Sequence, residues 1–241
     1  MKMADVHCHI LPAVDDGAYD LSETREMLKT AYEEGIRTIF ATPHYHGEMG
    51  SGVWAKRKAM LKETQRIARE VSEDFRILAG SEIFYSEKAV KDLLEGTVWT
   101  MNDSCYVLVE FVPYEEFSYI KRGLQTLQYH GFWPILAHVE RYEDLMKIER
   151  VRQLTDMGIY LQVNAGSVLG KNGRLVKNYI RELLKERMIH LVGTDAHGSR
   201  HRRPLMAKCA SYIEKKTDRQ YCRDICRENA RKIIRREYIN V

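Results

Sequence analysis

The chain has 241 residues, of which 44% are hydrophobic and 30% are charged, so it can form a sizeable core as one large domain or two small ones. Its 38 basic and 34 acidic residues give a formal net charge of +4. That excess is too small to predict a nucleic-acid partner without a localised basic patch. We expect no nucleic acid partner and a single domain over residues 1–241.

The five cysteines are odd in number and dispersed, which argues against a disulfide framework and favours a reducing compartment. The first residues lead almost directly into a strand, and no run of roughly 18 apolar residues occurs. We therefore expect neither a signal peptide nor a membrane span, and we expect a cytoplasmic location.

Strand-like and helix-like segments alternate along the chain. Strands are predicted around Val6 and at residues 38–42, 75–81, 106–109, 133–137, 159–163 and 189–194. Helices are predicted from a cap at Ser22 to a stop at Gly35, and at residues 54–73, 87–94, 117–130, 142–157, 175–186 and from 204 onward. This alternation predicts βαβ units and a parallel sheet, either open or closed into a barrel.

Polar side chains mark the carboxyl end of most predicted strands, which favours the barrel because those ends form one common rim. His7 and His9 point to one face of their strand, since residues i and i+2 share a face. The candidate rim residues are His7, His9, Asp16, His44, Glu82, Glu110, His138, Asp195 and His197.

These residues supply imidazole and carboxylate ligands but no thiolate, and the set is larger than one ion needs. Two or three divalent cations bridged by Glu82 would use it, and the ligand types suit manganese, iron or zinc better than copper. Cys8 is expected to be buried on the opposite face of its strand from the two histidines. Spacing alone leaves open whether Asp15 or Asp16 is the loop ligand.

Short motifs lie in order along nearly the whole chain. They are HCH at 7–9, LPAVDDG at 11–17, ATPH at 41–44, the strand-end residues Glu82 and Glu110, HVERY at 138–142 and TDAH at 194–197. With these motifs and gaps the chain resembles the PHP superfamily, and within it the CpsB/YwqE-type bacterial tyrosine-protein phosphatases of capsule and exopolysaccharide synthesis.

The resemblance implies an α/β fold, a distorted (β/α)7 TIM-like barrel, with three metal ions, commonly Mn²⁺, acting on phosphotyrosine. It implies that one ion is held by His7, His9, Glu82 and Asp195, a second by Glu82, Glu110 and His138, and a third by Asp16, His44 and His197. It favours Asp16 over Asp15. His138 is thereby both a metal ligand and one of the expected catalytic residues.

Arg141 matches a family arginine that binds the substrate phosphate. A second family arginine follows the final Asp-x-His motif, and here this chain departs from the pattern, with Gly198 where an asparagine is typical. Counting from Asp195 favours Arg202, whereas the Arg-Pro pair favours Arg203. The implied partner is a phosphotyrosine protein, an autophosphorylating bacterial tyrosine kinase with a tyrosine-rich tail.

Clustered metal ions generate hydroxide from bound water at neutral pH, so the expected hydrolysis needs no covalent enzyme intermediate. A cysteine phosphatase is disfavoured, because none of the five cysteines has an arginine six positions later. Glycine-rich nucleotide-binding motifs are also missing from the sequence.

Three alternatives remain open. Another PHP phosphoesterase, such as a histidinol-phosphate phosphatase or a nuclease-like enzyme, would have almost the same site. An amidohydrolase also begins with His-x-His, but that class usually has a bridging lysine where this chain has Glu110. A catalytically silent phospho-binding module is disfavoured by the intact set of candidate ligands together with Arg141.

Overall fold

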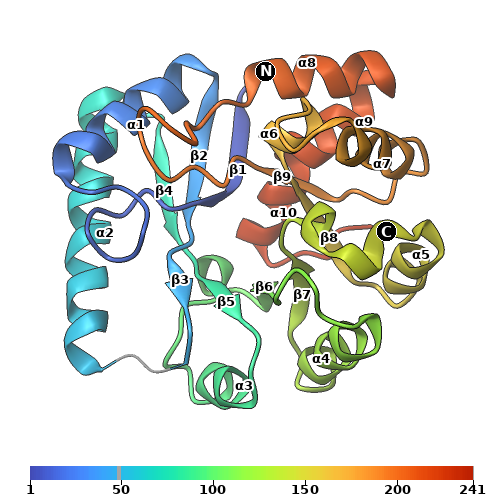
Figure 1. Ribbon diagram of the computed structural model, residues 1–241. Helices are drawn as coiled ribbons and strands as arrows, with labels where there is room; N and C mark the ends of the chain where they lie inside the picture. Colours follow the sequence, from blue (N-terminus) through green and yellow to red (C-terminus); the bar gives the residue numbers. More distant parts are fainter. Residues whose placement is uncertain (48–49, 241) are drawn as a thin grey trace.

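The computed structural model describes residues 1–47 and 50–240, in which strands alternate with helices (Figure 1). The strands are β1 Met3–Cys8, β2 Ile36–Ala41, β3 His44–Tyr45, β4 Arg76–Ala79, β5 Glu82–Phe84, β6 Tyr106–Glu110, β7 Trp133–Leu136, β8 Tyr160–Asn164 and β9 Leu191–Gly193. The α-helices are α1 Leu21–Glu33, α2 Ser51–Val71, α3 Glu87–Leu94, α4 Phe117–Tyr129, α5 Ile148–Asp156, α6 Ala165–Val168, α7 Arg174–Lys185, α8 Ala207–Lys216, α9 Arg219–Arg223 and α10 Asn229–Arg235. Shorter 3-10 turns lie at Met101–Asp103, Val139–Arg141 and Glu143–Met146, and a π-helical turn lies at Asp224–Glu228.

All paired strands are parallel, in the orders β1-β2-β4 and β3-β5-β6-β7-β8-β9. The two sheets are continuous along the chain, because β2 runs into β3 and β4 runs into β5. The curl brings β1 back to β9, where Asp195 N donates to His7 O at 2.7 Å and His9 N donates to Ala196 O at 2.9 Å. This confirms the predicted α/β fold, a distorted TIM-like barrel.

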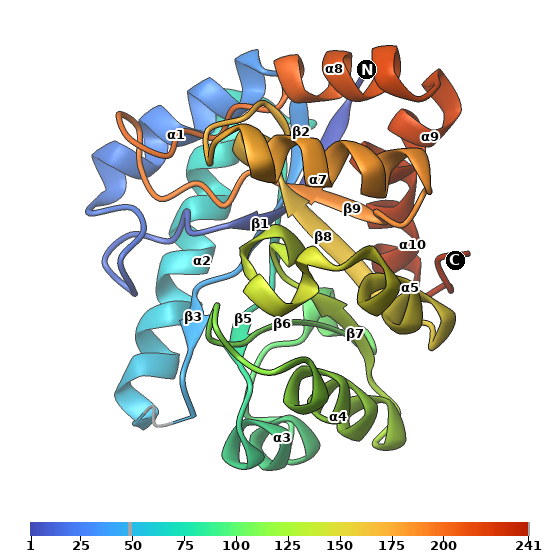
Figure 2. The same cartoon turned by 45° about the vertical axis from the view of Figure 1, so that its right-hand side comes forward.

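Helices cover the outside of the curled sheet (Figure 2). In the view turned by 45°, α4 lies against β7 and α5 lies beside β8. None of the helices in the described ranges is long and apolar enough to cross a membrane.

One strand is interrupted where the sequence predicted a continuous run. The strand predicted over 75–81 ends at Ala79 as β4, and pairing resumes as β5 after Gly80 and Ser81. The second strand ends before Pro43, which has no N–H to donate, and the chain pairs again as β3 beyond that proline. The expectation that Glu82 follows the end of its strand is therefore wrong, because Glu82 begins β5. The breaks place His44 and Glu82 directly opposite each other in the register of β3 and β5.

Helix boundaries also differ from expectation in two places. The N-cap of α1 is Asp20, not Ser22, because the Asp20 carboxylate accepts the backbone N–H of Glu23 at 2.8 Å. The helix predicted over 142–157 begins only at Ile148, after two 3-10 turns. Tyr142 is fully buried there, and its hydroxyl accepts the N–H of Phe111 at 3.1 Å, which holds the chain against the end of β6.

The C-terminal region is helical as predicted, but in several pieces. After α8 and α9, the π-helical turn leads into α10, which ends at a left-handed Arg236 with φ of 60°. The following residues run extended beside the sheet, where Ile239 N donates to the Tyr106 hydroxyl at 3.0 Å. The last described residues are thus anchored to the barrel.

The apolar core has two parts. Side chains from β1, β2 and β6 to β9, including Val6, Phe40 and Leu108, form one cluster with Ile233 of α10 inside the curl. A larger cluster fills the space between the strands and the outer helices, and it contains Cys8, which is fully buried as expected. The interior cluster leaves the carboxyl ends of the strands to polar side chains.

His190, just before β9, is buried, and its Nδ1 accepts the N–H of Leu161 at 3.0 Å. Burial disfavours its charged form and lowers its pKa to about 4 from the ordinary 6.5. In the unfolded chain this histidine protonates near pH 6.5, so between pH 6.5 and 4 the unfolded state binds more protons. The free energy of unfolding therefore falls as the pH falls, by at most about 1.4 kcal/mol per pH unit from this group.

His190→Asn should keep an acceptor for Leu161 and remove this titration. As the pH falls from 6.5 to 4, the wild type should lose roughly 2–3 kcal/mol more of its unfolding free energy than the variant loses. Urea unfolding of both proteins across this pH range measures the difference. A difference independent of pH would show that His190 is not a buried neutral group.

Candidate metal centre

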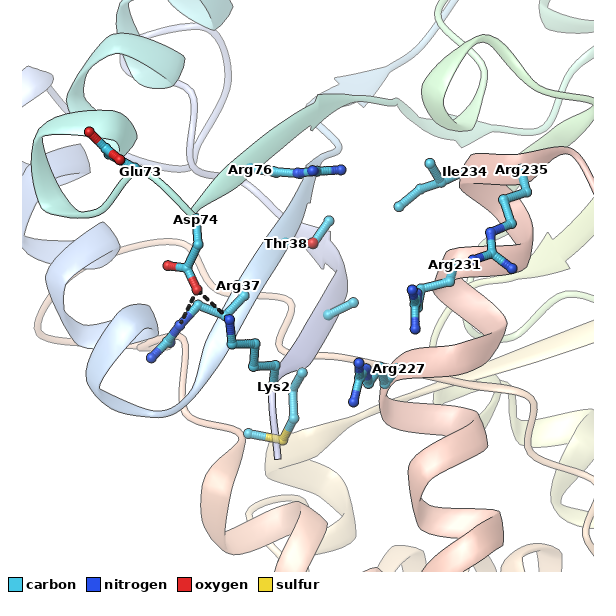
Figure 3. A pocket seen from close by; sticks show the side chains of 12 residues that line it. Lys2, Arg37, Thr38, Glu73, Asp74, Arg76, Arg227, Arg231, Ile234 and Arg235 are labelled. Carbon is cyan, nitrogen blue, oxygen red and sulfur yellow. Dashed lines mark hydrogen bonds and ion pairs between the residues drawn. The ribbon is translucent and has the colours of Figure 1, made fainter.

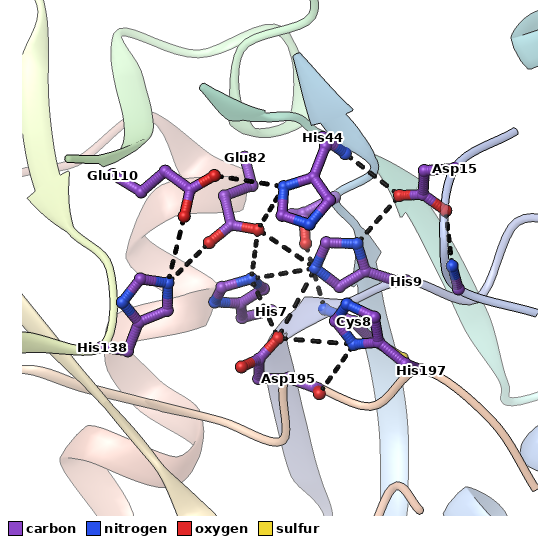
Figure 4. A network of polar contacts seen from close by, with 12 residues as sticks. His7, Cys8, His9, Asp15, His44, Glu82, Glu110, His138, Asp195 and His197 are labelled. Atoms are coloured by element: carbon purple, nitrogen blue, oxygen red, sulfur yellow. Dashed lines mark hydrogen bonds and ion pairs between the residues drawn. The ribbon is translucent and has the colours of Figure 1, made fainter. Parts of the chain in front are cut away.

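The nine candidate ligands come together at the carboxyl rim of the barrel, and Figure 4 labels all of them except Asp16. They are His7 and His9 from β1 and its end, Asp16 from the following loop, His44 from β3, Glu82 from β5, Glu110 from β6, His138 after β7, and Asp195 and His197 after β9. The two arginines that contact Asp195, Arg141 and Arg202, reach the same rim.

An irregularity in β1 turns its histidines inward. Ala4 and Val6 belong to the interior cluster, and the register with β2 shifts between Asp5 and Cys8. A bulge of this kind re-aims side chains relative to strict alternation. His7 therefore points to the rim although Val6, its neighbour, also faces the interior.

Two glycines make room for the histidines. A Cβ on Gly193 would lie 2.5 Å from the Cβ of His7, and a Cβ on Gly17 would lie 2.1 Å from the carbonyl oxygen of His9. Both approaches are closer than any side chain permits. Only glycine lets β9 and the loop after β1 pack this tightly around the two imidazoles.

Glu82 lies at the centre of the cluster and is 1% exposed. Its Oε2 is 3.1 Å from Nε2 of His7 and from Nε2 of His9, and 3.0 Å from Nδ1 of His44. Its Oε1 is 2.8 Å from Nε2 of His138. A single carboxylate thus contacts four imidazoles, which is the arrangement of a bridging ligand.

Three groups of side chains have ligand atoms within 4.8 Å of one another. They are His9, Asp16, His44 and His197; His7, His9 and Asp195; and His44, Glu82 and Glu110. The groups resemble the three sets implied by the family, with three differences. His138 belongs to none of the groups, Glu82 is absent from the group of His7 and Asp195, and His9 and His44 are each shared between two groups. Shared ligands keep the candidate ion sites next to each other.

Three imidazoles are oriented through Nδ1, leaving Nε2 for a ligand role. His9 Nδ1 donates to Asp15 Oδ2 at 2.9 Å, and His197 Nδ1 donates to the carbonyl oxygen of Asp195 at 3.0 Å. His7 Nδ1 lies 3.2 Å from Gln162 Oε1. Because the opposite ring nitrogen is then unprotonated in the neutral imidazole, each Nε2 offers a lone pair toward the centre.

The charge balance of the site also fits cations. Burial disfavours the charged form of His9, but hydrogen bonds and negative charge from Asp15 and Glu82 raise its pKa to about 9. Burial acts in the same way on His138, whose pKa is raised to about 9 by Glu110 and Glu82. Burial alone would raise the pKa of Glu82, but the surrounding imidazoles hold that pKa well below its usual range. Divalent cations would take over this positive charge and displace the protons, since a ligating imidazole is neutral.

Buried ligand atoms without hydrogen bonds also indicate a metal site. Among the described residues, Glu82 Oε2 and His197 Nε2 are buried and make no hydrogen bond, although three imidazole nitrogens lie 3.0–3.1 Å from the glutamate oxygen. The Nε2 atoms of His7 and His9 lie 3.2 Å apart, so at most one proton fits between them. Buried polar atoms are normally satisfied, and ions between these ligands would satisfy them.

The two loop aspartates have different surroundings. Asp15 Oδ2 contacts His9 Nδ1 at 2.9 Å and accepts the backbone N–H of His44 at 3.1 Å, while Asp15 Oδ1 accepts that of Gly17 at 3.0 Å. Asp16 Oδ1 lies 3.4 Å from His44 Nε2 and 3.5 Å from His197 Nε2. Asp15 thus positions ligands, whereas Asp16 is placed to be one.

A polar network that we did not predict supports the far side of the site. The oxygen of the Gln162 amide accepts the backbone N–H of His138 at 2.8 Å as well as contacting His7, and its nitrogen donates to Asn164 Oδ1 at 2.9 Å. Asn164 Nδ2 in turn donates to Asp195 Oδ2 at 2.8 Å. The period-two pattern of β8, which ends at this rim, was the only sequence signal for these two residues.

Cationic side chains gather beside Asp195. Arg141 Nη2 contacts Asp195 Oδ2, and Arg202 Nη2 lies 2.7 Å from the same oxygen. Both arginines line a cavity of about 90 Å³ together with Arg203 and Lys171. Lys171 lies in the loop region after β8, where side chains are expected near the carboxyl rim. It belongs to no motif that would have singled it out in the sequence.

Left-handed backbone occurs at three of these positions. His138, Asp195 and Arg202 have φ of 34°, 52° and 48°, a conformation that costs non-glycine residues energy. Such conformations persist where surrounding contacts enforce them, and they concentrate at functional sites.

Comparison with known families identifies the chain. A family model described as capsular polysaccharide synthesis, CpsB/CapC, matches residues 3–235. The chain belongs to the CpsB/CapC family.

Named relatives of this CpsB/CapC-family protein cover almost its full length. Tyrosine-protein phosphatase CpsB of Streptococcus pneumoniae is 34% identical over 238 residues, covering 96% of this chain and 98% of the relative. Tyrosine-protein phosphatase YwqE of Bacillus subtilis (strain 168) is 33% identical over 243 residues, covering 98% and 93%. The crystal structures of YwqE and CpsB from these organisms, described as unique metal-dependent tyrosine phosphatases, include a chain that matches with a TM-score of 0.88 and 30% identity, covering 99% of this chain and 96% of that one.

Asp15→Asn and Asp16→Asn should separate a positioning residue from a ligand. For Asp15→Asn we expect the affinity for Mn²⁺ to fall about 10–100-fold with an unchanged number of ions at saturation, because the orientation of His9 is weakened. For Asp16→Asn we expect fewer ions per chain at saturation. Elemental analysis after dialysis and competition with a chelator measure both quantities. Loss of an ion in Asp15→Asn with no effect of Asp16→Asn would reverse the assignment.

Proposed function

We propose that this CpsB/CapC-family protein is a metal-dependent phosphotyrosine-protein phosphatase. The observation that carries the proposal is the buried carboxylate of Glu82 among four imidazoles, with two arginines at the adjoining Asp195. The relatives CpsB and YwqE, which share a third of its residues, bear the name tyrosine-protein phosphatase.

The proposed cofactors are two to three divalent ions, with Mn²⁺ as the first choice and Fe or Zn as alternatives. The ligand sets proposed from the family resemblance are His7, His9, Glu82 and Asp195; Glu82, Glu110 and His138; and Asp16, His44 and His197. When bound, such ions supply a nucleophilic hydroxide near neutral pH and offset charge on the transferring phosphoryl group.

Arg141 and Arg202 are the proposed phosphate-binding residues. Their side chains are 33% and 46% exposed, so they are open to a substrate while one nitrogen of each contacts Asp195. The remaining N–H groups of each guanidinium can donate to two phosphoryl oxygens, a geometry that suits phosphate. Arg203 and Lys171 line the same cavity and would contact groups next to the phosphate.

Asp195 positions both arginines. Its carboxylate accepts a hydrogen bond from Asn164 and contacts the two guanidinium groups, so it fixes their distance from the metal ligands.

A tyrosine leaving group has a parent pKa of about 10, and it departs with less protonation than an alkoxide requires. We therefore assign no general acid.

The alternatives fit less well. A histidinol-phosphate phosphatase would use a similar rim, but the family match over residues 3–235 and the relatives' names favour phosphotyrosine. A silent phospho-binding module would not require nine converging ligand residues.

A bacterial tyrosine kinase with a phosphorylated tail is the proposed partner, in capsule or exopolysaccharide synthesis. The support is the family's description and the tyrosine-phosphatase names of the relatives. All five cysteines are free thiols, which fits the proposed cytoplasmic location.

The test is hydrolysis of a phosphotyrosine peptide, the matched phosphoserine peptide and histidinol phosphate, by chelator-treated protein with and without Mn²⁺. We expect phosphotyrosine to be favoured by at least about 100-fold in kcat/KM and activity to require the metal, because the phenolate is the better leaving group. Preference for histidinol phosphate would contradict the proposal, and so would the absence of turnover with Mn²⁺, Fe²⁺ and Zn²⁺.

Arg141→Gln supplies the residue-level control. We expect kcat/KM for the phosphotyrosine peptide to fall about 10²–10³-fold, since a donor to the transferring phosphoryl group is lost. The matched surface variant Arg152→Gln removes an arginine whose side chain, among the described residues, forms an ion pair only with Glu186, at 3.4 Å. It should keep wild-type activity. Equal activity of Arg141→Gln and Arg152→Gln would rule out the role assigned to Arg141.

A further inference from the structure

A second cavity lies at the opposite end of the barrel from the metal centre (Figure 3). Its volume is about 460 Å³, and it opens between the amino-terminal ends of β1, β2 and β4 on one side and α10 with the preceding π-helical turn on the other. His7 lies four residues beyond Met3 along β1, so this end is roughly 13 Å from the rim at a strand rise of ~3.3 Å per residue. The cavity is therefore separate from the phosphatase site.

Six cationic side chains line this cavity. They are Lys2, Arg37, Arg76, Arg227, Arg231 and Arg235. Of the described residues, only two with carboxylate side chains, Glu73 and Asp74, share the lining. The net charge of the whole chain is +4, so a large part of its basic excess is concentrated here.

The nearby carboxylates do not neutralise this charge. Asp74 Oδ2 lies 2.8 Å from Lys2 Nζ and 3.5 Å from Arg37 Nε. Glu228, outside the lining, is shared among three arginines, including Arg227 at 3.4 Å and Arg231 at 3.3 Å. Asp74 and Glu228 thus each pair with more than one cation.

Two of the cations have no anionic partner among the described residues. Within residues 1–47 and 50–240, no carboxylate oxygen lies within 4.0 Å of Arg76 or Arg235. Figure 3 shows them on opposite walls, Arg76 on the strand side and Arg235 on the helix side. A ligand between the walls can reach both.

The helix wall presents like charges at helical spacing. Arg227, Arg231 and Arg235 are each four residues apart, so they share one face and repel one another. A bound anion would turn the repulsion into attraction.

We propose that this cavity binds a small molecule that carries a diphosphate group, in the class of nucleoside diphosphates. The guanidinium fork matches phosphate oxygens, and cations on both walls suit two adjacent phosphates better than one. A volume of about 460 Å³ is in the range of small-molecule sites. Met3 and Ile234 supply apolar lining for the part of the ligand that is not charged.

The experiment is calorimetric titration of ADP into the Mn²⁺-loaded protein. Wild type is compared with Arg76→Gln/Arg235→Gln, whose exposed side chains leave no carboxylate unpaired when removed. The control Arg122→Gln/Arg181→Gln makes the same charge change on the exposed surfaces of α4 and α7. Arg141→Gln is titrated as well, to report any ADP bound at the metal centre.

We expect ADP to bind wild type, the control and Arg141→Gln alike, and to bind Arg76→Gln/Arg235→Gln at least about tenfold more weakly. Phosphotyrosine hydrolysis by Arg76→Gln/Arg235→Gln should stay within about twofold of wild type, so that failure here is distinguishable from failure of the proposed phosphatase activity. In the wild-type protein, ADP should also protect Arg76 and Arg235 from phenylglyoxal, as read by peptide mass spectrometry.

Four results would overturn the proposal. They are no ADP binding to wild type, equal binding by Arg76→Gln/Arg235→Gln, equal loss in the control double variant, or loss in Arg141→Gln. Tighter binding of a single-stranded oligonucleotide or of phosphatidylglycerol vesicles than of ADP, sensitive to the same double substitution, would assign the cavity to a macromolecular anion or a lipid surface instead.

Discussion

The arrangement of the rim depends on one buried carboxylate. Glu82 is 1% exposed and lies within 3.1 Å of nitrogens from four histidines on three different strands or strand ends. Burying so many ligand groups together is unfavourable unless positive charge neutralises the carboxylates and the imidazole nitrogens find partners. Divalent cations meet both requirements, and the remaining features of the site position the side chains around them.

The barrel provides this positioning through its irregularities. The breaks at Pro43 and at Gly80–Ser81 place His44 opposite Glu82. The irregularity in β1 turns His7 inward, and Gly193 lets β9 approach that histidine. A regular strand at any of these points would aim the side chain elsewhere. The apolar interior below the rim and the packed helices outside hold these local distortions in place.

The alternation of strands and helices and the rim position of the polar side chains were predictable, because both follow from periodicity and from the common direction of parallel strands. Asp20 as the cap of α1 was not, since several nearby polar residues could serve. Spacing could not separate Asp15 from Asp16, because only three-dimensional contacts show that Asp15 reaches His9 Nδ1. The alternating pattern of β8 places Gln162 and Asn164 on one face but does not show what they contact, because their partners lie more than 20 residues away.

Anomalous diffraction at the manganese edge, from crystals of the Mn²⁺-loaded protein, tests most directly whether Glu82 bridges a metal cluster. The account predicts two or three peaks at the carboxyl rim, with both Glu82 oxygens bonded to metal and with His7 and His138 on different ions. Peaks confined to other parts of the surface, or a rim in which Glu82 contacts only protonated histidines under saturating Mn²⁺, would contradict it.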